Sequence, residues 1–174
     1  NVETDCGECF FCRNGGVNNC THPLGGWALG CRIDGGQAEY ARIPFADTNL
    51  IPIPDGVSDE RALFTGDLLS TGYWAAKIAE IRKGDTLLVI GAGPAGYCAA
   101  LCALLHAPAR LVVCESDPFR RAFLQEHIPH AEAVSPAQAL PLLSRTERGG
   151  ADAVIEAEGT KESFRLAWEC ARPN

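Results

Sequence analysis

The clearest pattern of apolar and polar positions lies in residues 86–115. A short apolar run at 87–90 has the length and β-branched content of a buried parallel strand. A glycine-rich turn at 91–96 follows, and then a segment rich in Ala and Leu, which is the composition of a buried helix. A second apolar run, 111–114, ends at Glu115. This stretch therefore predicts a strand, a turn, a helix and a second strand.

The residues that follow continue this alternation. We expect helices at 118–127, 136–145 and 161–171, and strands at 131–134 and 153–155. The second of these helices has a start signal, because Ser135 can cap it and Pro136 suits its first position. Strands that alternate with helices predict an α/β fold with a parallel sheet and right-handed crossovers.

The N-terminal third of the chain has weaker patterns. Residues 1–26 are rich in Cys, Gly and Asn. They cannot build a core alone, so we expect a loop that needs a staple. Short strands are expected within 27–54, and one of them at 38–44.

Two helices are expected before the clear pattern begins. Ser58 marks the start of the first, as a capping residue. The second is expected at 70–81. Its predicted apolar face consists of Trp74, Ala75, Ile78 and Ile81.

Composition adds limits on compartment and partners. The 174 residues are 47% hydrophobic and 21% charged, an ordinary globular balance. The formal charge of −7 argues against a nucleic-acid or anionic-membrane partner. Nine cysteines, either clustered or scattered in apolar runs, favour a reduced, cytoplasmic protein over a disulfide-rich secreted one. The chain has no Met and stops before the further strands of a doubly wound sheet, so we expect it to be part of a longer protein.

The glycine turn predicts a dinucleotide site. Gly91 permits a tight turn, Gly93 leaves room for a pyrophosphate, and Gly96 allows close packing of the helix on the strand. The helix N-terminus offers free N–H groups to phosphates. An ordinary glycine loop is the alternative, but the strand, helix and acid all fall in register with the turn. The expected nucleotide-binding residues are Gly91, Gly93, Pro94, Ala95, Gly96 and Glu115.

Glu115 favours NAD over NADP. A carboxylate at this position can accept bonds from both ribose hydroxyls, and it would repel a 2′-phosphate. Arg120 and Arg121 follow closely and could weaken this preference. The simpler interpretation of both is that they are solvent-exposed helix residues.

Four cysteines have the spacing of metal ligands. Cys6, Cys9, Cys12 and Cys20 form the pattern C-x2-C-x2-C-x7-C. Four thiolates suit a closed, tetrahedral zinc ion, which would be structural rather than catalytic. An iron–sulfur cluster is the main alternative, although its bacterial signature has a tighter fourth spacing followed by Pro. Disulfides or free thiols are the remaining alternative.

The other candidate ligands have simpler explanations. We expect five cysteines to be buried small side chains. They are Cys31, Cys98, Cys102, Cys114 and Cys170. His22 lies near the cysteine cluster in the sequence, but four cysteines already complete a tetrahedral ligand set. We therefore expect His22 to be a histidine on a surface loop.

A cysteine lobe, short strands and a dinucleotide-binding unit, in this order, resemble the zinc-dependent medium-chain (alcohol) dehydrogenase family. The resemblance rests on the cysteine lobe, residues 36–40, residues 66–73 and the glycine turn. It implies part of a GroES-like catalytic domain with a zinc lobe at 1–60, and an incomplete NAD(P)-binding Rossmann domain at 61–174. The run 46–50 together with Asp67 resembles the branch of glutathione-independent formaldehyde dehydrogenases and bacterial secondary-alcohol dehydrogenases.

The resemblance also implies a second, catalytic zinc. Asp67 matches the position of its third ligand, and Thr71 matches a threonine that contacts the nicotinamide. On residue type alone, Asp67 is a helix cap or surface acid and Thr71 a helix N-terminal hydroxyl. The family's Cys and His ligands would lie upstream of the cysteine lobe, where residues 1–5 of this chain contain neither Cys nor His. We therefore expect the chain to be inactive alone.

The expected activity of the whole protein is zinc-dependent hydride transfer between NAD and an alcohol, aldehyde or ketone. The expected partners are a small-molecule substrate and further copies of the chain, as a homodimer or homotetramer. The alternative is a non-catalytic nucleotide-binding protein that keeps only the structural zinc.

Overall fold

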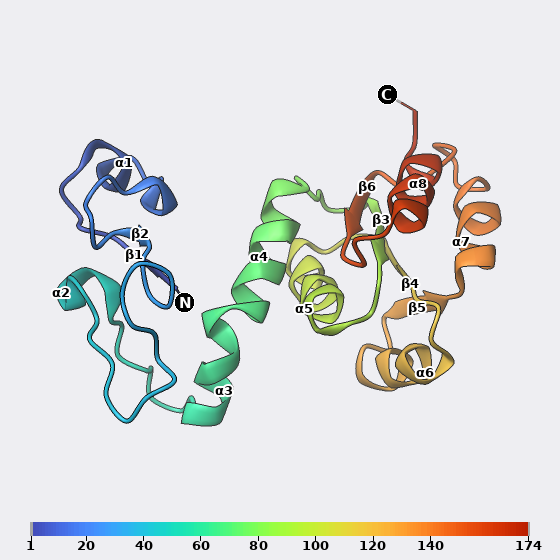
Figure 1. Cartoon of the computed structure of the whole chain (residues 1–174). Coiled ribbons are helices and arrows are strands. Elements are labelled where there is room, and N and C mark those ends of the chain that lie inside the picture. Colours follow the sequence, from blue (N-terminus) through green and yellow to red (C-terminus); the bar gives the residue numbers. More distant parts are fainter. Residues whose placement is uncertain (1, 174) are drawn as a thin grey trace. The chain divides into compact units, whose positions relative to one another are not determined.

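A computed structural model describes residues 2–173 of the chain. The chain divides into two compact units, Asn1–Leu63 and Phe64–Asn174 (Figure 1). Each unit is described separately below.

The second unit is built on a parallel four-stranded sheet. Its strands are β3 (Thr86–Ile90), β4 (Arg110–Cys114), β5 (Ala131–Val134) and β6 (Ala153–Glu156). They lie in the order β5-β4-β3-β6, and every neighbouring pair is parallel. The order reverses between β3 and β6, which is the switch point of a doubly wound fold. The predicted α/β class and parallel sheet are confirmed.

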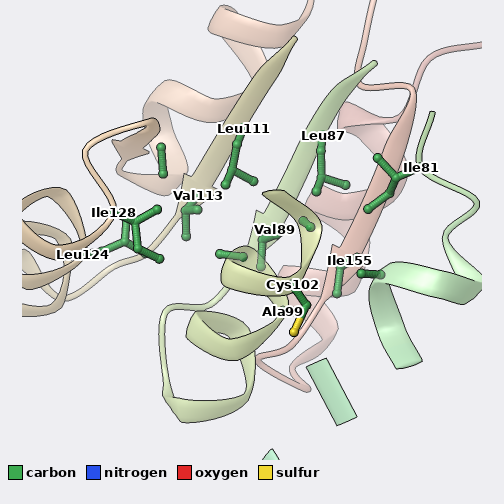
Figure 2. Close-up of a cluster of buried hydrophobic side chains, with 14 residues drawn as sticks. Ile81, Leu87, Val89, Ala99, Cys102, Leu111, Val113, Leu124, Ile128 and Ile155 are labelled. Carbon is green, nitrogen blue, oxygen red and sulfur yellow. The ribbon is translucent and has the colours of Figure 1, made fainter. Parts of the chain in front are cut away.

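Helices cover both faces of this sheet. They are α4 (Leu68–Ile78), α5 (Pro94–Ala103), α6 (Pro118–His127), α7 (Pro136–Leu143) and α8 (Lys161–Cys170), with single 3-10 turns at Phe64–Gly66 and Leu104–His106. Side chains alternate between the faces along each strand. Leu87 and Val89 pack with α5 and α6 (Figure 2), whereas Leu88 and Ile90 pack with α7 and α8.

Helix α5 lies between the sheet and α4. Ala99, Ala100 and Ala103 of α5 are buried, and so is Ala76 of α4. A Cβ at Gly72 of α4 would lie 2.6 Å from the backbone carbon of Cys98. The two helices therefore approach closely because α4 has no side chain at this position.

Strand register brings the predicted nucleotide-binding residues to one edge of the sheet. Ile90 pairs with Cys114, so the residues that follow, Gly91 and Glu115, leave their strands side by side. The N–H of Gly91 donates to the Cys114 carbonyl at 2.7 Å. This edge also holds the end of β6, because Ile90 pairs with Glu156 on its other side.

The first unit has little regular structure. Its elements are β1 (Glu3–Thr4), α1 (Phe10–Arg13), the 3-10 turn Val17–Asn19, β2 (Gly26–Trp27), α2 (Ala46–Asn49) and α3 (Asp59–Leu63). β1 and β2 form a two-stranded antiparallel pair. Within the described part of this unit, the buried apolar side chains are only Cys20, Ala28 and Pro44. A unit with so small a core needs another source of stability, as we expected from the composition of residues 1–26.

The prediction of short strands within 27–54 is largely wrong. Residues 38–44 form no strand, and Tyr40 within them is 91% exposed. A strand needs a hydrogen-bonding partner, and no described strand pairs with this segment. Residues 38–44 therefore alternate apolar and polar side chains without forming a hydrogen-bonded strand.

Helix positions agree better with prediction than helix ends do. α6 spans the predicted residues, and Ser58 accepts a hydrogen bond from the Arg61 N–H at the start of α3. The helix predicted at 70–81 instead spans Leu68–Ile78. Its predicted apolar face is wrong in part, because Trp74 and Ile78 are exposed while Ile81 is buried beyond the helix end. The helices predicted at 136–145 and 161–171 end at Leu143 and Cys170.

No helix within residues 2–173 combines the length and the apolar character needed to cross a membrane.

Candidate functional site

The four clustered cysteines converge in the first unit. Cys9 precedes α1, Cys12 lies within it, and their sulfurs are 3.4 Å apart across one helical turn. Cys6 Sγ lies 3.9 Å from Cys12 Sγ, and Cys20 Sγ lies 3.9 Å from Cys9 Sγ. All four sulfurs lie within 4.8 Å of one another. Spacing by two residues therefore places the thiols on one side of a single turn.

This arrangement fits a tetrahedral metal ion. Four sulfurs at about 2.3 Å from a zinc ion lie about 3.8 Å from one another, close to the separations seen here. A disulfide needs about 2.05 Å between sulfurs, and all nine cysteines are free. Among the described residues, these four form the only group of three or more side chains that could hold a metal ion.

The backbone around the cluster favours thiolates. N–H groups of Cys12 and Thr21 lower the pKa of Cys9 to about 6. An N–H of Glu8 lowers the pKa of Cys6 in the same way. Burial and the adjacent Cys9 raise the pKa of Cys12 to about 12. Several adjacent thiolates repel one another, so a bound cation would compensate the charge of this cluster.

Side chains around the lobe replace a hydrophobic core. The Asn49 amide receives the Asp5 N–H at 2.9 Å and donates to the Asp5 carbonyl at 2.9 Å. Thr48 donates to the same carbonyl. Residues 46–50, noted in the sequence for their resemblance to one branch of the family, thus tie α2 to the segment before the first cysteine.

The remaining cysteines and His22 mostly follow the predictions. Cys102, Cys114 and Cys170 are buried and Cys98 is partly buried. The prediction for Cys31 is wrong, because this residue is exposed in a turn. His22 is exposed; its Nδ1 accepts the Leu24 N–H and its ring contacts Phe45.

Three glycines of the turn after β3 have three different physical reasons. Gly91 has a φ of +90°, which side-chain residues rarely adopt. A Cβ at Gly96 would lie 1.9 Å from the Gly91 carbonyl oxygen, so only glycine lets α5 approach the strand this closely. A Cβ at Gly93 would have one atom within 4 Å, Arg120 Nη1 at 3.8 Å, which is an ordinary contact with a side chain. The missing side chain at Gly93 therefore leaves room that a pyrophosphate would need.

The start of α5 completes this turn. Gly93 is the N-cap, with extended backbone, and Pro94 is the first helical residue. The N–H groups of Ala95 and Gly96 fall in the first turn, where a helix has no partners for them. The chain can therefore present backbone donors to an anion at the edge where β3 ends.

Glu115 lies beneath the turn and is only 6% exposed. Its Oε2 accepts the Ala92 N–H at 2.7 Å, and its Oε1 accepts the Asp117 N–H at 2.8 Å and the Ser116 hydroxyl at 3.2 Å. Burial alone would raise the pKa of Glu115, but the N–H groups of Asp117 and Ala92 outweigh it and lower the pKa. The carboxylate is therefore held ionised.

The two arginines of α6 have different surroundings. Arg121 Nη1 donates to the Glu115 and Ser116 carbonyls at 2.6 and 2.7 Å, so this side chain supports the turn after β4. Arg120 Nη1 lies 3.9 Å from Glu115 Oε2 and is half exposed. Arg120 thus lies beside both Gly93 and Glu115. The adjacent positions of Arg120 and Arg121 in the sequence did not indicate that their surroundings differ.

Sequence reasoning missed the loop after β6. A Cβ at Gly91 would lie 3.2 Å from the backbone carbon of Ala157, so this loop borders the glycine turn. Glu156 accepts the N–H groups of Glu158 and Gly159 and the Ser163 hydroxyl, each at 2.8 Å. The sequence signal for this loop was Glu156 at the end of a strand, with Gly159 and Thr160 shortly after it.

Asp67 and Thr71 lie at the start of α4. Asp67 is the N-cap, and its Oδ1 accepts the Thr71 hydroxyl at 3.3 Å. Both side chains are exposed. Within residues 2–173, no group of three metal-binding side chains includes Asp67.

Comparisons with known proteins agree with this fold and cluster. No protein-family model matches the chain. A zinc-type alcohol dehydrogenase B of Aspergillus flavus is 35% identical over 98% of this chain and 41% of its own length. A medium chain reductase/dehydrogenase of Acremonium sp. is 33% identical over 97% of this chain and 60% of its own length.

Solved structures show the same similarity. Zinc dependent alcohol dehydrogenase 2 from Streptococcus pneumonia, in its apo form, has a TM-score of 0.85 and 32% identity. The match covers 99% of this chain and 49% of that one, so the chain spans about half the length of the relatives it matches. Over this span, the fold is the start of a Rossmann sheet preceded by part of a GroES-like domain. These similarities support the zinc-type alcohol dehydrogenase, or medium-chain dehydrogenase, family for the part of its length that this chain covers.

Proposed function

We propose that this chain is part of a zinc-dependent oxidoreductase that transfers a hydride between NAD and an alcohol, aldehyde or ketone. The observation that carries the proposal is the glycine turn, in which no backbone crowds Gly93 and the Ala92 N–H donates to a buried, ionised Glu115. Phosphates would bind at the N–H groups of Ala95 and Gly96, and ribose hydroxyls at the Glu115 carboxylate.

The preferred cofactor in this proposal is NAD. The Glu115 carboxylate would repel a 2′-phosphate, which NADP carries and NAD lacks. Arg120 lies 3.9 Å from this carboxylate and would reduce that repulsion. We therefore expect a preference for NAD that is smaller than an unpaired acid would produce.

The four clustered cysteines would hold a structural zinc ion. Their thiols converge at separations that suit a tetrahedral ion, and four protein ligands leave no open position for a substrate. The ion would order a unit that has few buried hydrophobic side chains.

The catalytic roles proposed for α4 rest on the family resemblance. Asp67 would be one ligand of a catalytic zinc, and Thr71 would border the nicotinamide. When bound, the metal supplies Lewis acidity at the substrate oxygen and the nicotinamide supplies a hydride acceptor. The hydrogen bond from Thr71 to Asp67 Oδ1 would orient the carboxylate, leaving Oδ2 for the metal. Further ligands would come from residues outside this chain.

The remaining assignments concern the whole protein. We place residues 1–60 in its catalytic domain and residues 61–174 in its cofactor domain. We propose a cytoplasmic homodimer or homotetramer acting on small molecules, in the branch of formaldehyde and secondary-alcohol dehydrogenases.

A non-catalytic nucleotide-binding protein is the second candidate. One observation favours it: among the described residues, the cysteine cluster is the only group of three or more side chains that could hold a metal ion, and Asp67 is not a member of it. Such a protein would bind NAD and one zinc ion without turnover.

Zinc content and turnover of the full-length protein distinguish the candidates. The proposed enzyme binds two zinc ions per chain and reduces NAD with an alcohol, and Asp67→Ala removes one ion and abolishes turnover. Glu132→Gln, a change of an exposed acid on β5, should leave both properties unchanged. One zinc ion with intact NAD binding and no NADH formation would establish the second candidate instead.

A further inference from the structure

The Glu115 carboxylate joins two turns that are far apart in the sequence. Its Oε2 accepts the N–H of Ala92 in the turn between β3 and α5, at 2.7 Å. Its Oε1 accepts the N–H of Asp117 in the turn between β4 and α6, at 2.8 Å. Both bonds are charge-assisted and short, and the side chain is 6% exposed. One buried carboxylate thus connects both sides of the proposed nucleotide site.

The hydrogen bond from Ala92 to Glu115 lies next to Gly93, the part of the turn that would receive the phosphates. Ala92 lies directly before Gly93, whose missing side chain leaves room for a pyrophosphate. Gly91 on its other side has a φ of +90°, and glycine tolerates several other backbone conformations equally well. The bond to Ala92 therefore restrains a turn that its glycines leave free, before any nucleotide binds.

The same carboxylate has limited capacity for a ribose. An ionised carboxylate offers about four lone-pair sites. The N–H groups of Ala92 and Asp117 and the Ser116 hydroxyl occupy three of them, while Arg120 at 3.9 Å is too far for a hydrogen bond. Two ribose hydroxyls need two sites, so one existing donor has to leave. The Ser116 hydroxyl has the longest bond, 3.2 Å, and belongs to an exposed residue.

We propose that Glu115 is a positioning residue for the glycine turn, and that a nucleotide ribose replaces the Ser116 hydroxyl rather than the Ala92 N–H. The proposal rests on the nucleotide binding proposed above. It gives one carboxylate two roles: Oε2 holds the turn that receives the phosphates, and Oε1 exchanges a serine hydroxyl for the ribose.

Two nucleotides separate these roles. ADP carries the 2′- and 3′-hydroxyls of the ribose, whereas 2′,3′-dideoxy-ADP carries the same phosphates without them. Glu115→Gln keeps the size of the side chain but has a single acceptor oxygen, so it cannot accept from both turns. If Glu115 positions the turn, this variant binds 2′,3′-dideoxy-ADP about tenfold more weakly than the wild type does, which is the effect of one charge-assisted hydrogen bond.

The measurement is titration calorimetry of the whole chain with both nucleotides. Glu132→Gln makes the same chemical change at an exposed acid of β5, which pairs with Arg110, and should leave both affinities unchanged. Unchanged affinity of Glu115→Gln for 2′,3′-dideoxy-ADP would overturn the positioning role. A wild-type chain that binds neither nucleotide would instead contradict the proposed function, so the two failures are distinguishable.

Ser116→Ala tests the exchange and does not depend on Glu115→Gln remaining folded. Removal of the hydroxyl frees a lone pair, so we expect ADP to bind a few fold more tightly while 2′,3′-dideoxy-ADP binds as before. Unchanged or weaker ADP binding would overturn the exchange. The Ala92 amide proton gives a direct readout by NMR: its downfield shift should persist in Ser116→Ala and when ADP binds, and should be lost in Glu115→Ala, which has no acceptor oxygen.

Discussion

At the scale of single residues, glycine meets a different structural requirement at each of several positions. The motif spacing anticipated Gly91, Gly93 and Gly96, because a strand and helix flank them at the expected positions. It did not anticipate Gly72, whose missing side chain lets α4 approach Cys98 of α5. That contact joins residues from two helices, so no local pattern encodes it.

Alanine substitutions should separate packing from binding. Gly96→Ala places a Cβ against the Gly91 carbonyl and should lower the free energy of unfolding by about 3 kcal/mol. Gly93 has a φ of −66°, which alanine adopts readily, so Gly93→Ala should preserve stability and weaken NAD binding. Urea denaturation and NAD titration measure the two effects. Equal stability of the two variants would contradict this account of the turn.

A cysteine in the cluster should differ from a cysteine outside it. Cys9→Ser removes a thiolate that lies 3.4 Å from Cys12 Sγ, and the bound zinc should fall from one ion per chain toward none. Cys31→Ser is the matched control, because this exposed thiol lies outside the cluster. Atomic emission of the purified chains measures both. Full zinc content in Cys9→Ser would argue against this metal site.

At the scale of elements, strands were predictable where they are buried. Residues 87–90 and 111–114 form strands because apolar side chains on both faces have a sheet position to fill. Residues 38–44 alternate apolar and polar side chains instead and have no strand partner, so they remain irregular. Helix ends were less predictable: α4 stops at Ile78, three residues before Ile81 enters the core.

Buried carboxylates link these elements and predict a pH dependence. Burial would raise the pKa of Asp152, but the Thr86 N–H and Arg148 outweigh it and lower the pKa. The pKa of Glu156 is lowered in the same way, against burial, by the N–H of Gly159 and the Ser163 hydroxyl. Together with Glu115, three acids of the second unit therefore bind protons more weakly when folded than when unfolded.

The sign of the effect follows from these directions. Because the unfolded chain takes up protons at a higher pH than the folded one, the stabilisation is complete above about pH 5 and is lost progressively below it. The urea concentration at the midpoint of unfolding should therefore decrease as the pH is lowered from about 7 to about 3. Asp152→Asn should be less stable at neutral pH and show a flatter pH profile. A midpoint that stays constant in the wild type would contradict the prediction.

At the scale of the whole molecule, the two units depend on different sources of order. The second has a hydrophobic core on both faces of its sheet. The first, in its described part, buries only Cys20, Ala28 and Pro44 among apolar side chains and relies on four convergent thiols and polar contacts. Metal binding can supply on the order of 10 kcal/mol to such a loop-rich unit.

Metal removal should consequently affect one unit. With a strong chelator, hydrogen exchange should accelerate in residues 3–27, while β3–β6 of the second unit keep their protection. Exchange followed by mass spectrometry resolves the two units in one experiment, and readdition of zinc should restore protection. Unchanged exchange in the cysteine lobe would show that metal is not what orders it.

The sequence by itself determined the class of the fold, the cysteine lobe and the glycine turn. Each depends on spacing within a short segment, and the physical rules for such segments are local. Only the tertiary structure decided that Arg121 supports a backbone turn while Arg120 borders the site, and that Glu115 accepts the Ala92 N–H. The contact of Glu115 with Ala92 and that of Arg120 with Gly93 depend on the register of β3 against β4, which brings residues more than twenty positions apart to one edge of the sheet.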